Sequence, residues 1–574
     1  MMGKMKKTLF LFLAACCMAA CSEDLSEYYT RIDQREAANE ALKKKNDNLS
    51  SANDALSKRN ADIAAMNARL KLEGEALREK LLALEASTRQ PKDPKLLTME
   101  FVADDNTSLK ANVTCEVIGD SIIDCWLPSI MNDKYLIPRF TFDGTLVTID
   151  EKEAESGVSM FDFTKPVVLT VHTSAKSVSY TMYVHAYTGL PRLYIDIAGK
   201  KEVTSKDYYL DATLKLVEDV KTRAAGDVVT APVHIKGRGN SSWTQPKKPY
   251  RLKFDDKIAL LGEHKDRSWV LVANYSDKSM LRNALSYHMG KMSNLEWTPS
   301  SHFVELFING RYDGTYLLCE KVKVSNHRVA VGDDGFLLEC NRWADQEEGN
   351  VYFYTPHLTP AVVIKEPDVQ VGDANFEYVK NYMLVVEQVL FSENFTEPVN
   401  GWQKYMDMDS FVDWYLIHEM SKNVDCMFNF STYLNLPKNG KLHMGPIWDF
   451  DIAYGNIKQS DTSYLKWVFP SGNLLSVTQW YSRLMKDPAF VARLKERFAY
   501  FYSHKNELLT YLNESAQYLR YAVAENEARW GTLYHYTFKN YNIWGAYVNE
   551  VQDLKEWLNS RLDWMKADYD KLKP

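Results

Sequence analysis

Two acidic groups in the last third of the chain have the residue types of a phosphoryl-transfer site. Asp425 lies two residues after Asn423. Further along the chain, residues 447–451 read Ile-Trp-Asp-Phe-Asp and contain Asp449 and Asp451. In such sites a first Asp orients or deprotonates a hydroxyl nucleophile, and a second acidic group holds Mg²⁺ on the phosphates. Mg²⁺ suits these ligands because it is small, prefers oxygen and retains water. The spacing alone also fits a strand end whose acids face solvent.

A basic segment with two glycines, residues 236–254, precedes these acids. It reads Lys-Gly-Arg-Gly-Asn-Ser-Ser-Trp-Thr-Gln-Pro-Lys-Lys-Pro-Tyr-Arg-Leu-Lys-Phe, in a chain whose formal net charge is -7. Tyr250, Leu252 and Phe254 alternate with Arg251 and Lys253, which predicts a half-buried strand with its cations on one face. Those cations could meet a polyphosphate. The alternative is a solvated strand face next to a glycine turn.

Four motifs, taken together and in order, resemble the spore-coat protein H (CotH) kinase family. They occur between residues 190 and 500. The resemblance implies an atypical protein-kinase-like fold that transfers phosphate from ATP to protein serine. The motifs are the basic segment, the stretch from Leu271 to Asn283, the stretch from Val304 to Val322, and Gly445-Pro-Ile-Trp-Asp-Phe-Asp451 followed by Gly455-Asn456.

The resemblance also assigns roles to individual residues. Asp425 would be the catalytic Asp, and Asp449 the main metal ligand, with Asp451 as a second candidate. ATP with Mg²⁺ or Mn²⁺ would be the cofactor. Lys253, or as second choice Lys321, would take the part of the kinase strand lysine. The cations expected near phosphate are Arg238, Lys248, Arg251, Lys253 and Lys321.

Two features depart from the kinase pattern. The usual catalytic loop places Asn five residues after the catalytic Asp, but that position holds Phe430. The nearest amides are Asn429 and Asn423, so Asn429 is the candidate for a further metal ligand. No G-x-G-x-x-G loop is present, because Gly237-Arg-Gly239 is too short. These departures leave open a kinase-like head that binds a ligand or mediates adhesion without catalysis.

Residues 1–20 have the pattern of a lipoprotein signal peptide. Lys residues precede a short apolar run, which is too short to span a membrane as a mature helix. Met-Ala-Ala-Cys21 resembles a bacterial lipobox, and the acidic residues after it resemble the export tag of Bacteroidota lipoproteins. Cys16 is a competing site, and a secretory signal without lipid is the alternative. We expect an outer-membrane lipoprotein, anchored through Cys21 and exposed on the cell surface or facing the periplasm.

Residues 21–92 are expected to form a stalk. Leucine or isoleucine recurs every seven residues from Leu42 to Leu84, and asparagine follows a second heptad track from Asn39 to Asn67. With leucine at d and asparagine at a, the pattern predicts a coiled coil over 30–88, as a homo-dimer or homo-trimer. Two prolines, Pro91 and Pro94, end the helix. The alternative is one amphipathic helix lying on the body.

Residues 95–190 read as a small antiparallel β-sandwich, Ig-like in class, because short strand-like runs alternate with turn residues. Cys115 and Cys125 could form a disulfide across a hairpin or remain two buried thiols. The kinase-like domain is assigned to 191–505 and a helical C-terminal extension to 506–574. The fold class expected for the whole chain is therefore α+β.

Composition restricts the possible partners. The chain has 574 residues and is 25% charged, and its length suggests three or four domains. Apart from the basic segment no basic strip is present, so nucleic acid is not an expected partner. Cys319, Cys340 and Cys426 lack the spacing of a zinc site. The expected partners are an exported protein that accepts phosphate and the membrane. A purely structural envelope lipoprotein is the third alternative.

Overall fold

The computed structural model describes residues 2–86, 93–109, 111–127, 134–217, 228–426, 428–457, 462–468, 479–537 and 542–571. The chain divides into two compact units, residues 1–92 and 93–574. Within the described residues, no helix is long and apolar enough to cross a membrane.

The first unit is a single long helix, α1 (Met2–Ala86). Its side chains are described from residue 33 to 78 and at 80, so the lipidation expected at Cys21 lies outside the described side chains. The helix end expected at the prolines falls on residues 87–92, which also lie outside the described part. The heptad positions from Leu42 to Leu77 are more than half exposed in this unit. An exposed apolar seam of this length is what a coiled-coil partner would cover.

The second unit begins with three sheets, of three, six and two strands, whose buried apolar side chains form one core in the region predicted to be a sandwich. The alternating sequence runs form strands here because every second side chain is apolar and points into that core. The expectation of an entirely antiparallel sandwich is wrong at one pair, since β4 and β11 run parallel. Cys115 and Cys125 are buried free thiols. The strands are β1 (Lys95–Phe101), β2 (Val113–Thr114), β3 (Glu116–Ile118), β4 (Ile122–Leu127), β5 (Tyr135–Leu136), β6 (Pro138–Asp143), β7 (Leu146–Ile149), β8 (Lys152–Glu153), β9 (Phe161–Asp162), β10 (Val167–His172) and β11 (Ser177–Ala186).

A closed seven-stranded barrel follows, in the order β12-β13-β14-β15-β16-β18-β17. The parallel pairing of β12 with β17 closes it, and its interior is a separate apolar core. This closure was not among the sequence predictions. The strands are β12 (Arg192–Ile197), β13 (Leu210–Val217), β14 (Val228–Gly237), β15 (Tyr250–Ile258), β16 (Asp266–Val272), β17 (Ser301–Ile308) and β18 (Arg311–Glu320), with α2 (Arg282–Lys291) between β16 and β17.

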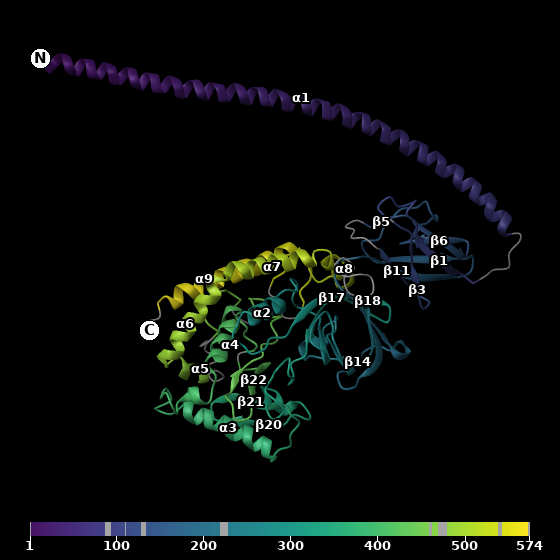
Figure 1. The fold of residues 1–574 in the computed structure, drawn as a ribbon. Helices are drawn as coiled ribbons and strands as arrows, with labels where there is room; N and C mark the ends of the chain where they lie inside the picture. Colours follow the sequence, from purple (N-terminus) through teal and green to yellow (C-terminus); the bar gives the residue numbers. More distant parts are fainter. Residues whose placement is uncertain are drawn as a thin grey trace. The chain divides into compact units, whose positions relative to one another are not determined.

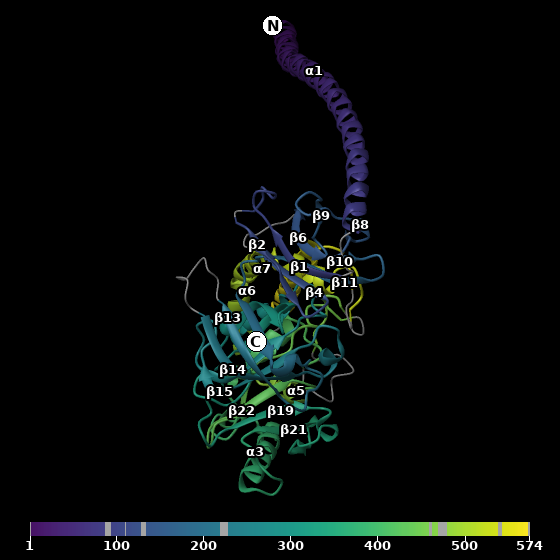
Figure 2. The ribbon, with the colours of Figure 1, turned by 90° about the vertical axis from the view of Figure 1, so that its right-hand side faces the viewer.

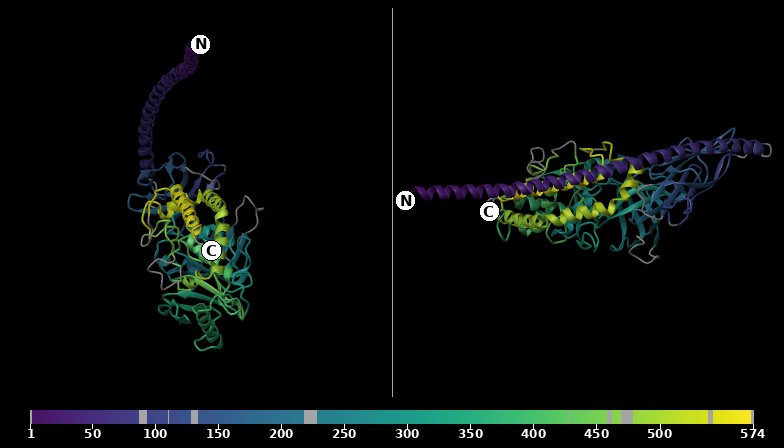
Figure 3. Two further views of the ribbon diagram at one scale, coloured as in Figure 1. Left: turned by 90° about the vertical axis from the view of Figure 1, so that its left-hand side faces the viewer. Right: turned by 90° about the horizontal axis from the view of Figure 1, so that it is seen from above.

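The rest of this unit is a five-stranded sheet, β20-β21-β19-β22-β23, and the helices around it. Figure 2 shows this sheet next to the barrel, with α3 beyond it. The C-terminal helices pack along one side of the body (Figure 3), and α9 contacts α4, α6 and α7. The elements are β19 (Phe336–Asn341), β20 (Tyr352–Thr355), β21 (Leu358–Glu366), β22 (Thr432–Leu436), β23 (His443–Met444), α3 (Ala374–Leu390), α4 (Met408–Met420), α5 (Gln479–Leu484), α6 (Pro488–Ser503), α7 (Lys505–Leu519), α8 (Ala522–Trp530) and α9 (Tyr547–Tyr569). The fold is therefore a mixed α+β fold, with a long N-terminal helix and a helical C-terminal region.

Candidate active site

A cavity of about 720 Å³ lies between the barrel and the five-stranded sheet. Its barrel wall is the β14–β15 connection, the residues that follow β16, and α2. Its sheet wall comes from β19, β21, the start of β22 and the two acidic segments. Asp425, Asp449, Asp451 and Arg238 all line it. Residues far apart in the sequence and expected to act together are thus brought to one cavity.

One buried amide holds the two acidic segments together. Asn423 is fully buried, and its Nδ2 donates to the backbone oxygen of Asp449 at 2.9 Å. Its Oδ1 accepts from the backbone N–H of Asp425 at 3.3 Å. The thiol of Cys426 also reaches the backbone oxygen of Asp449, at 3.3 Å. The relative position of the two aspartates is therefore fixed by contacts to their backbone atoms.

The backbone at Asp449 adopts an unusual conformation. Its φ is 70°, a left-handed value that Asp tolerates better than most residues but that still costs energy. Strained backbone of this kind clusters at functional sites. The Asp449 carboxylate accepts a hydrogen bond from the Ser431 hydroxyl at 3.3 Å. Ser431 also lines the cavity.

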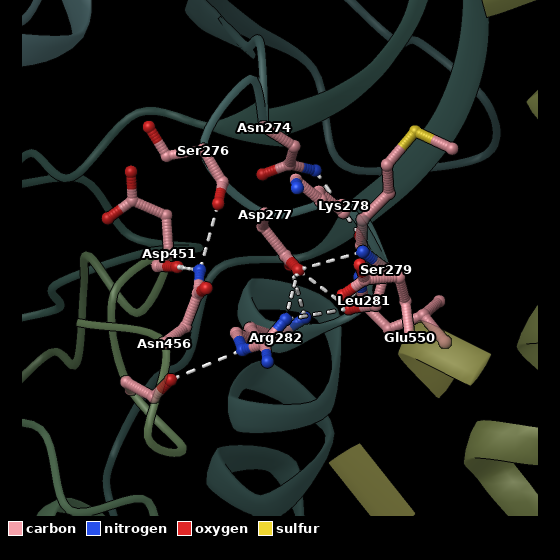
Figure 4. A network of polar contacts seen from close by, with 12 residues as sticks. Asn274, Ser276, Asp277, Lys278, Ser279, Leu281, Arg282, Asp451, Asn456 and Glu550 are labelled. Carbon is pink, nitrogen blue, oxygen red and sulfur yellow. Dashed lines mark hydrogen bonds and ion pairs between the residues drawn. The ribbon is translucent and has the colours of Figure 1, made fainter. Parts of the chain in front are cut away.

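Asp451 lies in a turn that is tied to the barrel side of the cavity (Figure 4). Asn456 donates to the backbone oxygens of Asp451 at 2.7 Å and of Ser276 at 2.9 Å. Asn283 of α2 accepts from the backbone N–H of Phe450 at 2.8 Å. The side chain of Asn283 also donates to Asn274 at 3.1 Å. These amides explain why the motif residues Asn274, Asn283 and Asn456 accompany the acidic segment.

A buried ion pair anchors the start of α2 beneath this turn. The Asp277 carboxylate accepts from the Arg282 guanidinium at 2.6 Å, and their side chains are 0% and 4% exposed. Asp277 also accepts from both the N–H and the hydroxyl of Ser279. Arg282 in turn donates to the backbone oxygen of Ala453 at 3.2 Å. Figure 4 shows these contacts converging on Asp277. The first turn of α2 is thereby bonded to the acidic segment.

The two glycines of the basic segment allow close packing beside the cavity. A Cβ at Gly237 would come within 2.3 Å of the Trp243 ring. Gly239 has a φ of 83°, and a Cβ there would lie 2.2 Å from the Ser242 hydroxyl oxygen. Arg238, between them, places its guanidinium 5.4 Å from the ring centroid of Trp448. The segment therefore brings one cation to the cavity wall, next to the ring of the residue that precedes Asp449.

The structure adds a charged pair that the sequence analysis missed. Lys365 of β21 lies 3.2 Å from the carboxylate of Glu339 on β19, and both residues line the cavity. Burial raises the pKa of Glu339, although Lys365 opposes that shift. The available signal was one acid, Glu339, within β19 and one lysine, Lys365, that follows an apolar run and precedes Glu366 at the end of β21. A buried strand has little reason to carry a charge unless the charge has a partner or a function.

Several cations expected near phosphate do not line the cavity. Leu252 and Phe254 fill the barrel, so alternation places Arg251 and Lys253 on the outer face of β15. Lys248 donates to the backbone oxygen of Trp243 at 2.9 Å. Lys321 lies 3.8 Å from Glu366, and burial lowers its pKa to about 8. This arrangement therefore does not favour the phosphate contacts that the sequence predicted for these four cations.

Comparison with known proteins places these residues in a family. A family model described as CotH kinase protein matches residues 235–565, more than half of the chain. The chain belongs to the CotH kinase protein family. The matched region contains the described residues that line the cavity from Arg238 to Ile452, while Lys206 lies before it.

Two other comparisons give no information about function. Comparison with curated proteins finds no match. A crystal structure of a proposed glycoside hydrolase from Bacteroides thetaiotaomicron shares 19% identity, with 34% of this chain and 51% of that chain covered and a TM-score of 0.15. The chain therefore spans about half the length of that structure, and a likeness at this score carries no argument about function.

The donor set of this CotH family cavity fits a magnesium ion that is shared with a bound nucleotide. No group of three or more His, Cys, Asp or Glu side chains among the described residues could hold a metal by itself. Mg²⁺ is usually bound through one or two carboxylates together with substrate phosphates and water. Asp449 and Asp451 can supply those carboxylates. Asn429, the other predicted ligand, does not line the cavity, and its buried Oδ1 accepts no hydrogen bond from the described residues.

Proposed function

We propose that this CotH family protein transfers the γ-phosphate of ATP to a serine hydroxyl of another protein. The observation that carries the proposal is one cavity lined by Asp425, Asp449 and Arg238 in a chain of this family. A kinase needs a residue that orients the hydroxyl, a carboxylate that holds the metal, and cations that bind phosphate. These three types of residue meet here.

Each residue has a separate task in this proposal. Asp425 orients the acceptor hydroxyl and accepts its proton. Asp449, with Asp451 as a second ligand, holds Mg²⁺ or Mn²⁺, which supplies positive charge to the phosphates. Arg238 and Lys365 lie on opposite walls and stabilise the negative charge of the transferring group. Glu339 holds the Lys365 ammonium in place, as the 3.2 Å contact indicates.

Calorimetry of ATP binding tests the metal assignment. The wild-type chain should bind ATP in the presence of Mg²⁺ or Mn²⁺ and lose most of that affinity when EDTA is added. Asp449→Asn should abolish the metal-dependent part. Asp256→Asn, at an exposed position on β15, is the matched control and should bind as wild type does. Equal metal-dependent affinity in Asp449→Asn would remove Asp449 as the ligand.

A second function is favoured by one departure from the kinase pattern. Phe430 stands where a kinase has its metal-binding Asn, and Asn429 is not on the cavity wall. A head that binds nucleotide or another ligand without transferring phosphate would have this property. Tight, metal-dependent nucleotide binding without turnover would support that function over catalysis.

The N-terminal region supports a proposal about location. We propose that Cys21 carries a lipid, that the protein is an outer-membrane lipoprotein, and that α1 pairs with one or two further copies of the chain. The acceptor would then be an exported protein. The support is the lipobox-like sequence and the exposed heptad seam of α1. Metabolic labelling with a fatty acid, lost in Cys21→Ser, tests the anchor.

A further inference from the structure

A buried charge cluster joins the sandwich to α8, more than three hundred residues later in the chain. One carboxylate oxygen of Glu525 accepts from the Lys134 ammonium at 2.5 Å and from the backbone N–H of Ala186 at 3.1 Å. Its other oxygen lies 3.2 Å from His185 Nδ1, and His185 Nε2 lies 3.2 Å from Asp124. The four side chains are between 3% and 10% exposed. Both oxygens of Glu525 are therefore occupied by groups from the sandwich.

Aromatic rings surround this cluster and extend the contact to the barrel. His185 stacks on Trp126 with ring centroids 4.8 Å apart, and it lies 4.8 Å from Tyr312 of β18. Trp126 also meets Phe307 of β17 at 4.8 Å. Figure 1 shows α8 beside β17 and β18, at the side of the barrel that meets the sandwich. Water is excluded here, so the charges depend on one another.

The next residue of α8 faces the cavity wall. Asn526 Oδ1 accepts from the Lys247 ammonium at 2.9 Å and from the backbone N–H of Thr315 at 3.2 Å. A Cβ at Gly314 would lie 2.8 Å from that same oxygen. Only a glycine lets α8 approach β18 this closely. Adjacent residues of one helix thus hold the sandwich on one side and Lys247 on the other.

Lys247 anchors the segment that lines the barrel wall of the cavity. It is 2% exposed, donates to the backbone oxygen of Thr315, and lies 4.5 Å from the Tyr316 ring centroid. The Tyr316 hydroxyl donates to the backbone oxygen of Lys248 at 2.9 Å. The end of segment 238–249 is therefore fixed to β18 and α8. Its other end, at Arg238, donates its backbone N–H to Pro249 at 3.2 Å.

We propose that the sandwich is a positioning element of the active site, which acts through Glu525, Asn526 and Lys247 on segment 238–249. Glu525 is then a positioning residue, since it does not line the cavity. Docking of the sandwich fixes α8, and α8 fixes Lys247 and the cation Arg238 beyond it. The inference rests on the proposed function only in assigning nucleotide phosphates to this segment.

Hydrogen exchange of the full chain tests the positioning without any nucleotide. In Glu525→Gln the backbone amides of 238–249 should exchange about tenfold faster, together with those of α8. Lys134→Met, which leaves α8 unaltered, should act in the same direction, and Lys134→Arg should restore slow exchange. Glu514→Gln, at an exposed position on α7, is the control and should change nothing.

Kinetics add a readout that a merely structural contact would not move. The KM for ATP should rise in Glu525→Gln and Lys134→Met, with a smaller change in kcat. Faster exchange in α8 with unchanged exchange in 238–249 would overturn the proposal. If exchange changes as expected but no variant, wild type included, transfers phosphate, the positioning holds and the proposed function fails.

Discussion

At the scale of single residues, the lysine that lines the cavity beside Glu339 is Lys365, which is not one of the cations predicted from the sequence. Lys365 lines the cavity, whereas Lys253 is exposed on the outer face of β15. Lys365→Met removes the ammonium that lies beside the partly buried Glu339 carboxylate, and with it one cation that we propose binds phosphate. We expect its KM for ATP to rise about tenfold or more. Lys253→Met is the matched control, and steady-state kinetics measures both.

A large effect from Lys253→Met with none from Lys365→Met would reverse this assignment. It would restore the residue that the sequence pattern favoured as the strand lysine. Lys253, the first choice from the sequence, lies in the basic segment that carries part of the family resemblance. Motif membership, however, does not say which face of a strand points to a cavity, since that depends on how the barrel closes.

The predicted acidic residues line the cavity, whereas most of the predicted cations do not. Asp425 and Asp449 lie in two loops. Hydrogen bonds of the Asn423 side chain join these loops, so the two aspartates lie close together. Glu339 and Lys365 lie in no sequence motif that marks them as site residues. They come from strands whose pairing, β19 with β21, is a long-range contact that local patterns do not encode.

At the scale of elements, the buried Asp277–Arg282 pair holds α2 to the acidic segment. Arg282→Met leaves Asp277 fully buried without its cation, which should cost about 3–5 kcal/mol of stability. Denaturant unfolding of the full chain measures this. Arg267→Met, exposed on β16, should cost almost nothing. A loss in Arg282→Met no larger than in Arg267→Met would mean that the pair contributes little.

The contact between the sandwich and α8 should depend on pH. Burial lowers the pKa of His185, but hydrogen bonds and charges from Asp124 and Glu525 outweigh burial, and the net pKa lies above the usual 6.5. Burial likewise opposes the charge of Glu525, yet His185 and Lys134 lower its pKa. The rings packed near His185 are those of Trp126, Tyr183 and Tyr312.

A raised histidine pKa stabilises the fold fully below pH 6.5, and the contribution is lost as pH rises through the raised value. The wild-type melting temperature should therefore fall from pH 6 to pH 9 more steeply than that of His185→Gln. Differential scanning calorimetry of the two proteins compares the slopes. Parallel slopes would show that His185 does not titrate in this range.

The alternating sequence patterns predicted where strands occur better than they predicted which strands pair. The alternating run at 250–254 became β15, and the region 95–190, where strand-like runs were expected, contains β4, β10 and β11 among its strands. The parallel pairing of β4 with β11 and the closure of the barrel by β12 and β17 were not predictable. Both join strands that are distant in the sequence, and alternation says which face is buried but not which neighbour is paired.

At the scale of the whole molecule, α1 should determine how many copies associate. Leu49→Glu with Leu56→Glu places charge on the heptad seam and should convert the oligomer to monomers. Ala55→Glu, at an outward position of the same heptads, is the control and should leave the oligomer intact. Sedimentation of the intact chain measures the mass. A monomeric wild type would contradict the coiled coil.

The central claim is that the cavity transfers phosphate, and transfer of labelled γ-phosphate from ATP tests it most directly. The body, residues 93–574, is incubated with Mg²⁺ or Mn²⁺ and casein-like acceptors, beside Asp425→Asn. We predict metal-dependent labelling of the body or the acceptor, reduced about 10²- to 10⁴-fold in the variant. Labelling that is equal in Asp425→Asn, or absent from the wild type despite metal-dependent ATP binding, would contradict the account.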